Sequence, residues 1–217
     1  MISLRTEMKS SLMAAGIAAM ALTAGVLAQG ERDASPAGTA ATEVLGKYDM
    51  KATPQPVYKG GKWIEITYGR PIKRGRDVFG GSGANYGKVA NPDAPVWRAG
   101  ANVTTRLKTE VPLVINGKTV SPGTYTMFID LKPNNWTLIV SNWKVQTHHD
   151  PKNTTEIWGA FGYTPDKDVV RAPMTASTLP WSVDQLTWEF TDMTDAGGKI
   201  TIMWDKTAAS VPFKVGM

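Results

Sequence analysis

The 217-residue chain has no cysteine and only two histidines. Without cysteine, a disulfide scaffold, a thiolate metal site and a cysteine nucleophile are all excluded. No Walker sequence is present, and no G-x-G-x-x-G motif occurs in a βαβ context, so nothing predicts a nucleotide cofactor. The excess of positive charge is also small, because the 24 Lys and Arg residues are nearly balanced by 19 Asp and Glu residues and the formal net charge is +5. We therefore expect no cofactor and no nucleic-acid partner.

Apolar and turn-forming residues, in contrast, are plentiful. Hydrophobic residues make up 42% of the chain and charged residues 20%, which is typical of a globular protein and excludes wholesale disorder, a coiled coil and collagen. The chain also has 21 glycines, 14 prolines and eight tryptophans. This composition favours a fold with many turns and an aromatic core.

The N-terminal segment has the pattern of a secretory signal peptide. Arg5 and Lys9 precede an apolar run at 12–28, which ends with small residues at its last and third-last positions before the polar Gln29. The pattern predicts a signal peptide at 1–28 with cleavage after Ala28. We therefore expect a periplasmic or secreted protein with no stable membrane span after cleavage. Retention of the run as an anchor is the alternative.

The next segment, residues 29–50, is poor in large apolar side chains. Val44, Leu45 and Tyr48 are the only ones before Met50. Such a segment buries too little surface to offset the entropy lost on ordering, so we predict a flexible linker. The remaining residues, 51–217, are predicted to form a single domain, which is long enough for a core of its own.

Period-two alternation recurs along this domain. Ile64, Ile66 and Tyr68 share one face of a predicted strand, with polar or exposed positions between them. Asn116-Gly117 is the dipeptide that best supplies the two positive φ angles of a type I′ turn, so a tight hairpin is predicted there. Both features indicate β structure.

The C-terminal part is predicted to form another hairpin around the turn at 195–198. The residues expected to pair across it are Leu186, Trp188 and Phe190 with Ile200, Ile202 and Trp204. Including segments 156–163 and 168–174, the chain has eight or nine short predicted strands and no amphipathic helix of twelve residues. This predicts an all-β fold, an antiparallel, jelly-roll-like β-sandwich, with a barrel as the alternative.

Several motifs go beyond alternation. In chain order they are ITYGRP (66–71), YGKV (86–89), WRAGAN (97–102), PGTY (122–125), WG (158–159) and YTPDKDVVR (163–171). In this order they resemble the bacterial family called domain of unknown function 2911, over roughly residues 53–213. The resemblance implies an exported, β-rich bacterial protein, and it supplies neither an activity nor catalytic residues.

The chain departs from the family pattern in two places. Residues 90–96, with two prolines, separate YGKV from WRAGAN, whereas family members usually run from one to the other directly. Val103 also stands where the family commonly has a glutamate. No function that needs a carboxylate at that position is expected here.

A polar cluster in glycine-rich loops is the candidate ligand site. Its predicted members are Arg70, Arg76, Tyr86, Trp97, Arg98 and Asn102. Arginine offers a planar fork for carboxylates, phosphates or sugar hydroxyls, and loops on a rigid scaffold commonly carry function. The structural alternative is that these arginines pair with nearby carboxylates such as Asp77 and Asp93, or cap loop carbonyls.

Several other tryptophans, one methionine and the two histidines are assigned by whether they lie in predicted strands or near predicted turns. Alternation places Met127, Trp136, Trp188 and Trp204 in the core. Trp143, Trp158 and Trp181 lie near turns and are better candidates for stacking on sugar rings. The adjacent His148 and His149 point to opposite faces of an extended chain, so no metal site is predicted.

Three functional hypotheses follow. The leading one is a non-enzymatic exported β-sandwich that binds a small or polymeric anionic or carbohydrate ligand through its Gly/Arg-rich loops. The second is an envelope hydrolase with carboxylate chemistry, for which Glu65 and Asp77 are candidates. The third is a structural or protein-interaction module of the cell envelope. No catalytic residues are assigned, and the oligomeric state stays open.

Overall fold

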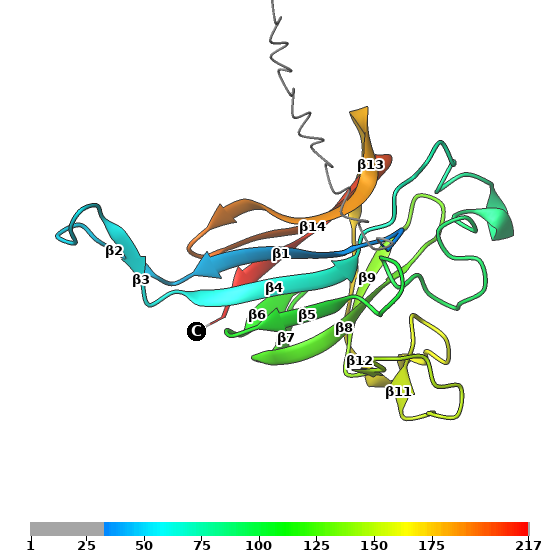
Figure 1. Cartoon of the computed structure of the whole chain (residues 1–217), viewed down its shortest axis with the longest axis horizontal. Helices are drawn as coiled ribbons and strands as arrows, with labels where there is room; N and C mark the ends of the chain where they lie inside the picture. Colours follow the sequence, from blue (N-terminus) through cyan, green and yellow to red (C-terminus); the bar gives the residue numbers. More distant parts are fainter. Residues whose placement is uncertain (1–32, 217) are drawn as a thin grey trace, which may run out of the picture. The chain divides into compact units, whose positions relative to one another are not determined.

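Two large antiparallel sheets form the body of the protein in a computed structural model that describes residues 33–216 (Figure 1). The strands of the first sheet, in spatial order, are β1 (Ala37–Val44), β4 (Lys62–Gly69), β5 (Arg106–Thr109), β8 (Gly123–Asp130), β9 (Thr137–Ser141) and β12 (Asp168–Pro173). Those of the second are β13 (Thr175–Thr194), β14 (Gly197–Val215), β6 (Leu113–Ile115) and β7 (Lys118–Val120). The predicted signal peptide, 1–28, lies outside the described residues.

Smaller elements lie in the connections. β2 (Lys47–Asp49) and β3 (Val57–Lys59) form an antiparallel hairpin, and β10 (Lys144–Val145) pairs in parallel with β11 (Glu156–Ile157). Within residues 33–216 the helical segments are two single 3-10 turns, η1 (Gly83–Asn85) and η2 (Pro165–Lys167). Neither has the length or apolar character to cross a membrane.

The core lies between the two large sheets, which confirms an antiparallel β-sandwich. Ile64 and Ile66 of β4 are fully buried in the same apolar cluster as Trp188 of β13 and Ile202 of β14. The alternation predicted from the sequence places these residues inward, because successive side chains of a strand point to opposite faces.

Both predicted hairpins are confirmed. Asn116 and Gly117 have φ of 48° and 74° and connect β6 to β7, as the type I′ geometry requires. At the C-terminal hairpin Trp188 pairs with Ile202 and Phe190 with Ile200. Turn chemistry and alternation therefore predict which strands pair, whereas a register shift between Thr191 and Thr194 sets the register of the C-terminal hairpin.

The linker predicted at 29–50 is corrected for the described residues that form β1 and β2. β1 pairs with β4 along its whole length, from Ala37 opposite Gly69 to Val44 opposite Lys62. Ala40 and Val44 are buried at 6% and 2% exposure. β1 is a sheet-edge strand ordered mainly by hydrogen bonds to β4, so it needs few large apolar side chains of its own.

The number of strands also differs from the prediction. Residues 33–216 form fourteen strands instead of eight or nine, and several of the additional ones are pairs of only two or three residues. The strand expected at 156–163 is limited to Glu156–Ile157, after which the chain forms tight turns at Gly159 and Gly162, both with positive φ.

One end of the sandwich is closed by aromatic side chains. Trp97, from the long connection between β4 and β5, stacks on Trp204 of β14 with ring centroids 6.0 Å apart. Phe79 contacts Trp97 and Trp136 edge-on at 5.6 and 4.7 Å. The predicted core positions of Trp136 and Trp204 are thereby confirmed. The connections at 70–105 and 142–167 lie at this end, away from the β2–β3 hairpin (Figure 1).

Candidate functional site

Two of the six predicted ligand-binding residues pack in the hydrophobic core or at its edge. Trp97 is 1% exposed and stacks on Trp204. Tyr86 is half-buried, and its hydroxyl accepts a hydrogen bond from Nε1 of Trp136 at 2.9 Å. Both side chains hold the long β4–β5 connection against the sandwich.

Arg70 and Arg76 make structural contacts within the described chain. Arg70 donates from Nε to the carbonyl of Leu186 at 3.4 Å, which ties the end of β4 to β13. Arg76 folds back on its own loop and donates to the carbonyls of Lys73 and Ile72 at 2.9 and 2.8 Å. This is the carbonyl-capping alternative that the sequence left open.

Arg98 and Asn102 lie at two different hollows. Arg98 lines a cavity of about 60 Å³ together with Trp97, and burial lowers the pKa of its guanidinium. Asn102 has φ of 59°, donates to the carbonyl of Ser35 at 3.2 Å and lines a separate pocket of about 250 Å³. The structure therefore does not bring the six residues into one shared pocket, and ligand binding by them stays a prediction.

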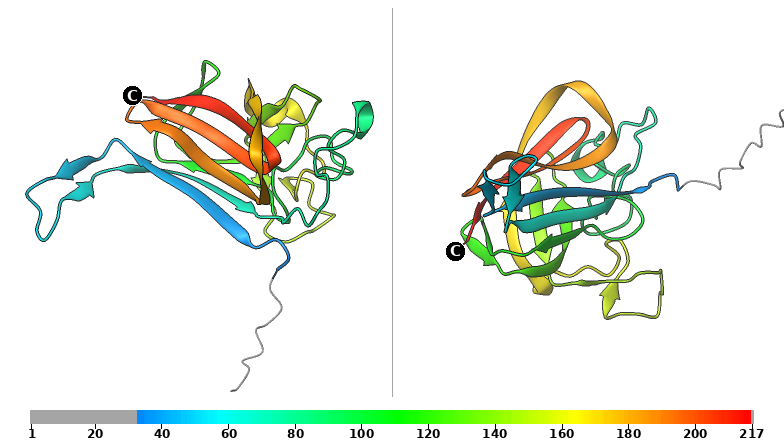
Figure 2. Two further views of the ribbon diagram at one scale, coloured as in Figure 1. Left: turned by 90° about the horizontal axis from the view of Figure 1, so that it is seen from above. Right: turned by 60° about the vertical axis from the view of Figure 1, so that its left-hand side comes forward.

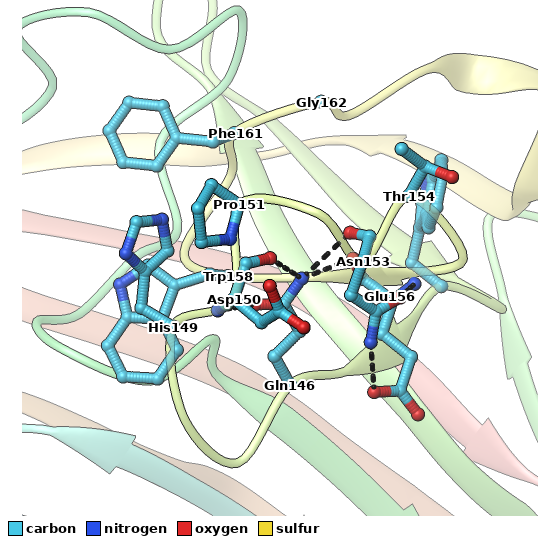
Figure 3. A pocket seen from close by; sticks show the side chains of 11 residues that line it. Gln146, His149, Asp150, Pro151, Asn153, Thr154, Glu156, Trp158, Phe161 and Gly162 are labelled. Atoms are coloured by element: carbon cyan, nitrogen blue, oxygen red, sulfur yellow. Dashed lines mark hydrogen bonds between the residues drawn. The ribbon is translucent and has the colours of Figure 1, made fainter.

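A larger pocket, of about 470 Å³, lies within the connection between β9 and β12 (Figure 3). We call it the β9–β12 pocket. Its lining residues are Trp143, Gln146, His149, Asp150, Pro151, Asn153, Thr154, Glu156, Trp158, Phe161 and Gly162. This volume falls in the range of small-molecule sites, about 300–1,000 Å³.

The buried side chain of Gln146 organises this pocket. Its Nε2 donates to the carbonyls of Asp150, Asn153 and Glu156 at 3.2, 3.0 and 3.0 Å, and its Oε1 accepts from the backbone N–H of Asp150 at 2.9 Å. Gln146 is only 5% exposed. One amide group thus satisfies the backbone at three points of a tight loop that has no regular structure of its own.

Asn153 completes the polar side of the pocket. Its Oδ1 accepts from the backbone N–H groups of Thr155 and Glu156, and its Nδ2 donates to Oε2 of Glu156 at 2.9 Å. These bonds hold the amide and the carboxylate together beside Thr154 (Figure 3). The result is a preorganised group of hydrogen-bonding side chains.

The opposite side of the pocket is aromatic. The rings of His149 and Trp158 lie 6.0 Å apart at 45°, and in Figure 3 Phe161 lies near them, away from Asn153 and Glu156. Phe161 is 52% exposed. Trp143 also lines the pocket, outside this group of three rings, and the ammonium of Lys167 lies 3.4 Å from its ring centroid. An aromatic side facing a polar side suits a ligand with both apolar and hydroxylated surfaces.

The predicted loop residues support this pocket from behind. Thr104, buried next to the WRAGAN motif, donates to the carbonyl of Gly159 at 2.8 Å. Gly159 has φ of 62°, and a Cβ at that position would lie 2.7 Å from Nη1 of Arg98. The positive φ favours glycine at this position of the WG motif, and a Cβ there would displace the end of the Arg98 side chain, which packs behind the turn next to Trp158.

Tyr163 anchors the far end of the same loop. Its hydroxyl donates to Oδ2 of Asp168 at 2.6 Å and accepts from Nη1 of Arg171 at 3.0 Å. Burial, and then the neighbouring Asp168 carboxylate, raises the pKa of the Tyr163 hydroxyl above its ordinary range. Tyr163 therefore stays a neutral donor at physiological pH.

The His, Asp and Glu side chains that could support metal binding or hydrolysis do not lie together in the structure. Among residues 33–216, no group of three or more His, Asp or Glu side chains is arranged to hold a metal ion. Glu65 lies 3.6 Å from the ammonium of Lys108 across β4 and β5, whereas Asp77 lies beside Gly80 in the following loop. Nothing in this placement favours the hydrolase hypothesis.

The β9–β12 pocket was only partly visible in the sequence. The sequence indicates Trp143 and Trp158 as stacking candidates and predicts no metal site at His149, and nothing in it brings the three residues together. The missed signal was the density of aromatic and amide side chains within 143–162. Gln146 was missed because a buried amide that organises a loop has no sequence motif.

The comparisons with known proteins support the resemblance seen in the sequence. No curated protein and no solved structure matches the chain. A family model does match, over residues 50–213, which includes all the motifs from ITYGRP to YTPDKDVVR. The chain therefore belongs to the family described as Protein of unknown function (DUF2911).

Proposed function

We propose that the protein is a non-enzymatic binding protein that takes a neutral, carbohydrate-like ligand in the β9–β12 pocket. The observation that carries the proposal is the two-sided lining, with His149, Trp158 and Phe161 on one side and Asn153 and Glu156 on the other. The C–H face of a sugar ring packs on an aromatic plane, while its hydroxyls need donors and acceptors around the rim.

The charge of the lining supports a neutral ligand over an anionic one. Asp150 and Glu156 are the acidic residues of the lining, and its eleven residues include no lysine or arginine. A carboxylate or phosphate would be repelled by these groups, whereas hydroxyl groups would donate to them. The ligand class is therefore narrower than the anionic or carbohydrate ligand expected for the Gly/Arg-rich loops.

Preorganisation also supports a binding role. The polar side chains are held by Gln146 and by the bonds of Asn153 before any ligand arrives. Ordering these groups therefore costs little on binding, which favours affinity.

The test is a panel of neutral and acidic oligosaccharides, titrated calorimetrically into the full chain. Trp158→Ala should abolish binding of a neutral hit, and Glu156→Gln should weaken it by about tenfold, because a hydrogen bond to a charged acceptor is lost. Trp181→Ala is the matched control, since Trp181 is a 62% exposed tryptophan of β13 outside the pocket. Binding should be unchanged in that control.

Two results would overturn the proposal. A hit whose affinity survives Trp158→Ala does not occupy this pocket. A ligand that no longer binds Asn102→Ala but still binds Trp158→Ala would occupy the Gly/Arg-rich loops instead, where the 250 Å³ pocket beside Asn102 lies.

We further propose that the chain is exported to the periplasm or beyond after cleavage behind Ala28. The support is the basic, apolar and small-residue pattern of residues 1–28. N-terminal sequencing of the protein recovered from a bacterial envelope fraction should begin at Gln29. A chain that keeps Met1 in that fraction would contradict cleavage.

A further inference from the structure

The β2–β3 hairpin projects away from both sheets of the sandwich (Figure 2). Tyr48 pairs with Tyr58 across it, and their rings meet edge-on with centroids 5.2 Å apart. The hydroxyl of Tyr58 accepts from the backbone N–H of Gly46 at 2.7 Å, which fixes the base of the hairpin. None of residues 45–60 is buried.

The hairpin carries unusually exposed apolar side chains. Met50 is 73% exposed and Tyr48 66%, and Leu45 and Val57 are exposed as well. An isolated two-stranded hairpin is marginally stable in water, and apolar side chains gathered on one projecting element mark an interaction site. These exposed side chains therefore favour an interaction surface for a partner outside the sandwich.

The charge of the hairpin indicates the chemistry of that partner. Lys47, Lys51 and Lys59 are exposed, and the only acidic residue among 45–60 is Asp49, which forms an ion pair with Lys59 at 3.0 Å. Lys47 and Lys51 flank Tyr48 and Met50 in the sequence. Lysines next to aromatic and apolar side chains are typical of segments that lie in a membrane interface, where aromatic rings sit at the headgroups and cations contact phosphates.

We propose that the β2–β3 hairpin docks on an anionic lipid surface, with Tyr48 and Met50 entering the headgroup region and Lys47 and Lys51 contacting lipid phosphates. A second copy of the chain is a poorer occupant, because it would bring the same unpaired lysines against each other. This proposal concerns a different part of the molecule from the β9–β12 pocket and does not rest on the proposed function.

The absence of cysteine makes a site-specific test possible. In the full chain, Met50→Cys carries an environment-sensitive fluorophore, and Thr119→Cys, exposed in the hairpin at 116–117, carries the same label as the matched control. With vesicles of equal phosphatidylglycerol and phosphatidylcholine, emission at position 50 should shift to shorter wavelength and become shielded from an aqueous quencher. Position 119 should not change, which separates docking by the hairpin from any binding by residues 1–28.

Charge removal gives a second readout. Lys47→Gln with Lys51→Gln should weaken binding to these vesicles by about 25-fold, since each lysine near an anionic surface contributes about fivefold. The control with equal charge removed elsewhere is Lys118→Gln with Lys214→Gln, both exposed in the second sheet. It should lose at most a few-fold in affinity.

Three results would overturn the proposal. Equal binding by the two charge variants would show that the hairpin lysines are not the contact. Vesicle binding without a spectral shift at position 50 would place the contact elsewhere. A shift at position 50 that appears without vesicles and grows with protein concentration would identify a second copy of the chain as the occupant.

Discussion

Replacing Gln146 by alanine should loosen the β9–β12 pocket without unfolding the sandwich. The substitution removes the partner of the Asn153 and Glu156 carbonyls and of the Asp150 N–H, while the Asp150 carbonyl keeps its bond from the backbone N–H of Asn153. At about 1 kcal/mol net for each bond, and with water replacing some of them, the local opening free energy falls by about 2–3 kcal/mol. Backbone amides of Asn153 and Thr155 should then exchange with deuterium about 30- to 150-fold faster.

Native-state hydrogen exchange followed by NMR measures this directly. The amide of Ile129, bonded to the carbonyl of Trp97 at 2.8 Å in the core, serves as the internal reference and should keep its rate. Thr147→Ala, at the exposed neighbouring position, is the matched control and should change no rate by more than about threefold. The reasoning is refuted if Gln146→Ala raises the exchange rate of the Asn153 amide by less than about threefold. It is also refuted if the substitution raises the exchange rate of the Ile129 amide by the same factor, because the effect is then not local.

Three further outcomes are expected. Trp97→Ala should lower the free energy of unfolding by about 3–5 kcal/mol in urea titration, because it removes a fully buried indole that stacks on the second sheet; a loss below 1 kcal/mol would contradict its core role. Gly159→Ala should weaken ligand binding at the β9–β12 pocket and speed exchange there, because φ of 62° strains an alanine and its Cβ would displace the guanidinium of Arg98 behind the turn; unchanged exchange would refute this. The Lys73 ammonium beside Asp205 lowers the pKa of that carboxyl, so the ion pair stabilises the fold above the ordinary pKa and this contribution is lost as pH falls below about 4. Lys73→Met should therefore be destabilised relative to wild type at pH 7, and the difference should shrink as the pH falls below about 4, as followed by urea unfolding across pH. A difference that stays constant in acid would contradict the ion-pair explanation.

The fold could be predicted where local chemistry decides it. Asn116 and Gly117 accept positive φ at little cost, so their hairpin is determined by the dipeptide. In β13 and β14 the apolar alternation defines which residues face inward, and the short turn makes the two strands neighbours, although a register shift between Thr191 and Thr194 sets Trp188 opposite Ile202. These features depend on neighbours in sequence or on one tight turn.

β1 could not be predicted in this way. Its residues are mostly Ala, Gly and Thr, whose intrinsic preferences for helix, turn and strand conflict, and they form a strand because β4 offers its free edge. Ala40 and Val44 fill the core margin where larger side chains are not needed. A segment that is ordered by hydrogen bonds to a distant strand carries little signal in its own composition.

The candidate site shows the same division. Four of the predicted polar residues are close in sequence, yet each has a different partner. Arg70 donates to a carbonyl of β13, Arg76 and Arg98 donate to carbonyls of their own loops, and Asn102 donates to the carbonyl of Ser35. Residues that are close in the sequence of a long connection need not point their side chains toward the same place. Whether the arginines converge depends on the path of that connection over the sandwich, which Trp97 and Tyr86 determine by their anchoring.

The sequence by itself determined the all-β class, the two hairpins, the inward faces of the strands and the family, because these follow from alternation, turn chemistry and ordered motifs. Only the tertiary structure decided that β1 joins the first sheet, that the predicted polar cluster is dispersed, and that the β9–β12 pocket combines aromatic and polar sides. The physical reason is that each of these depends on contacts between segments far apart in the chain or on a single buried amide, Gln146, whose role is defined by the backbone folded around it.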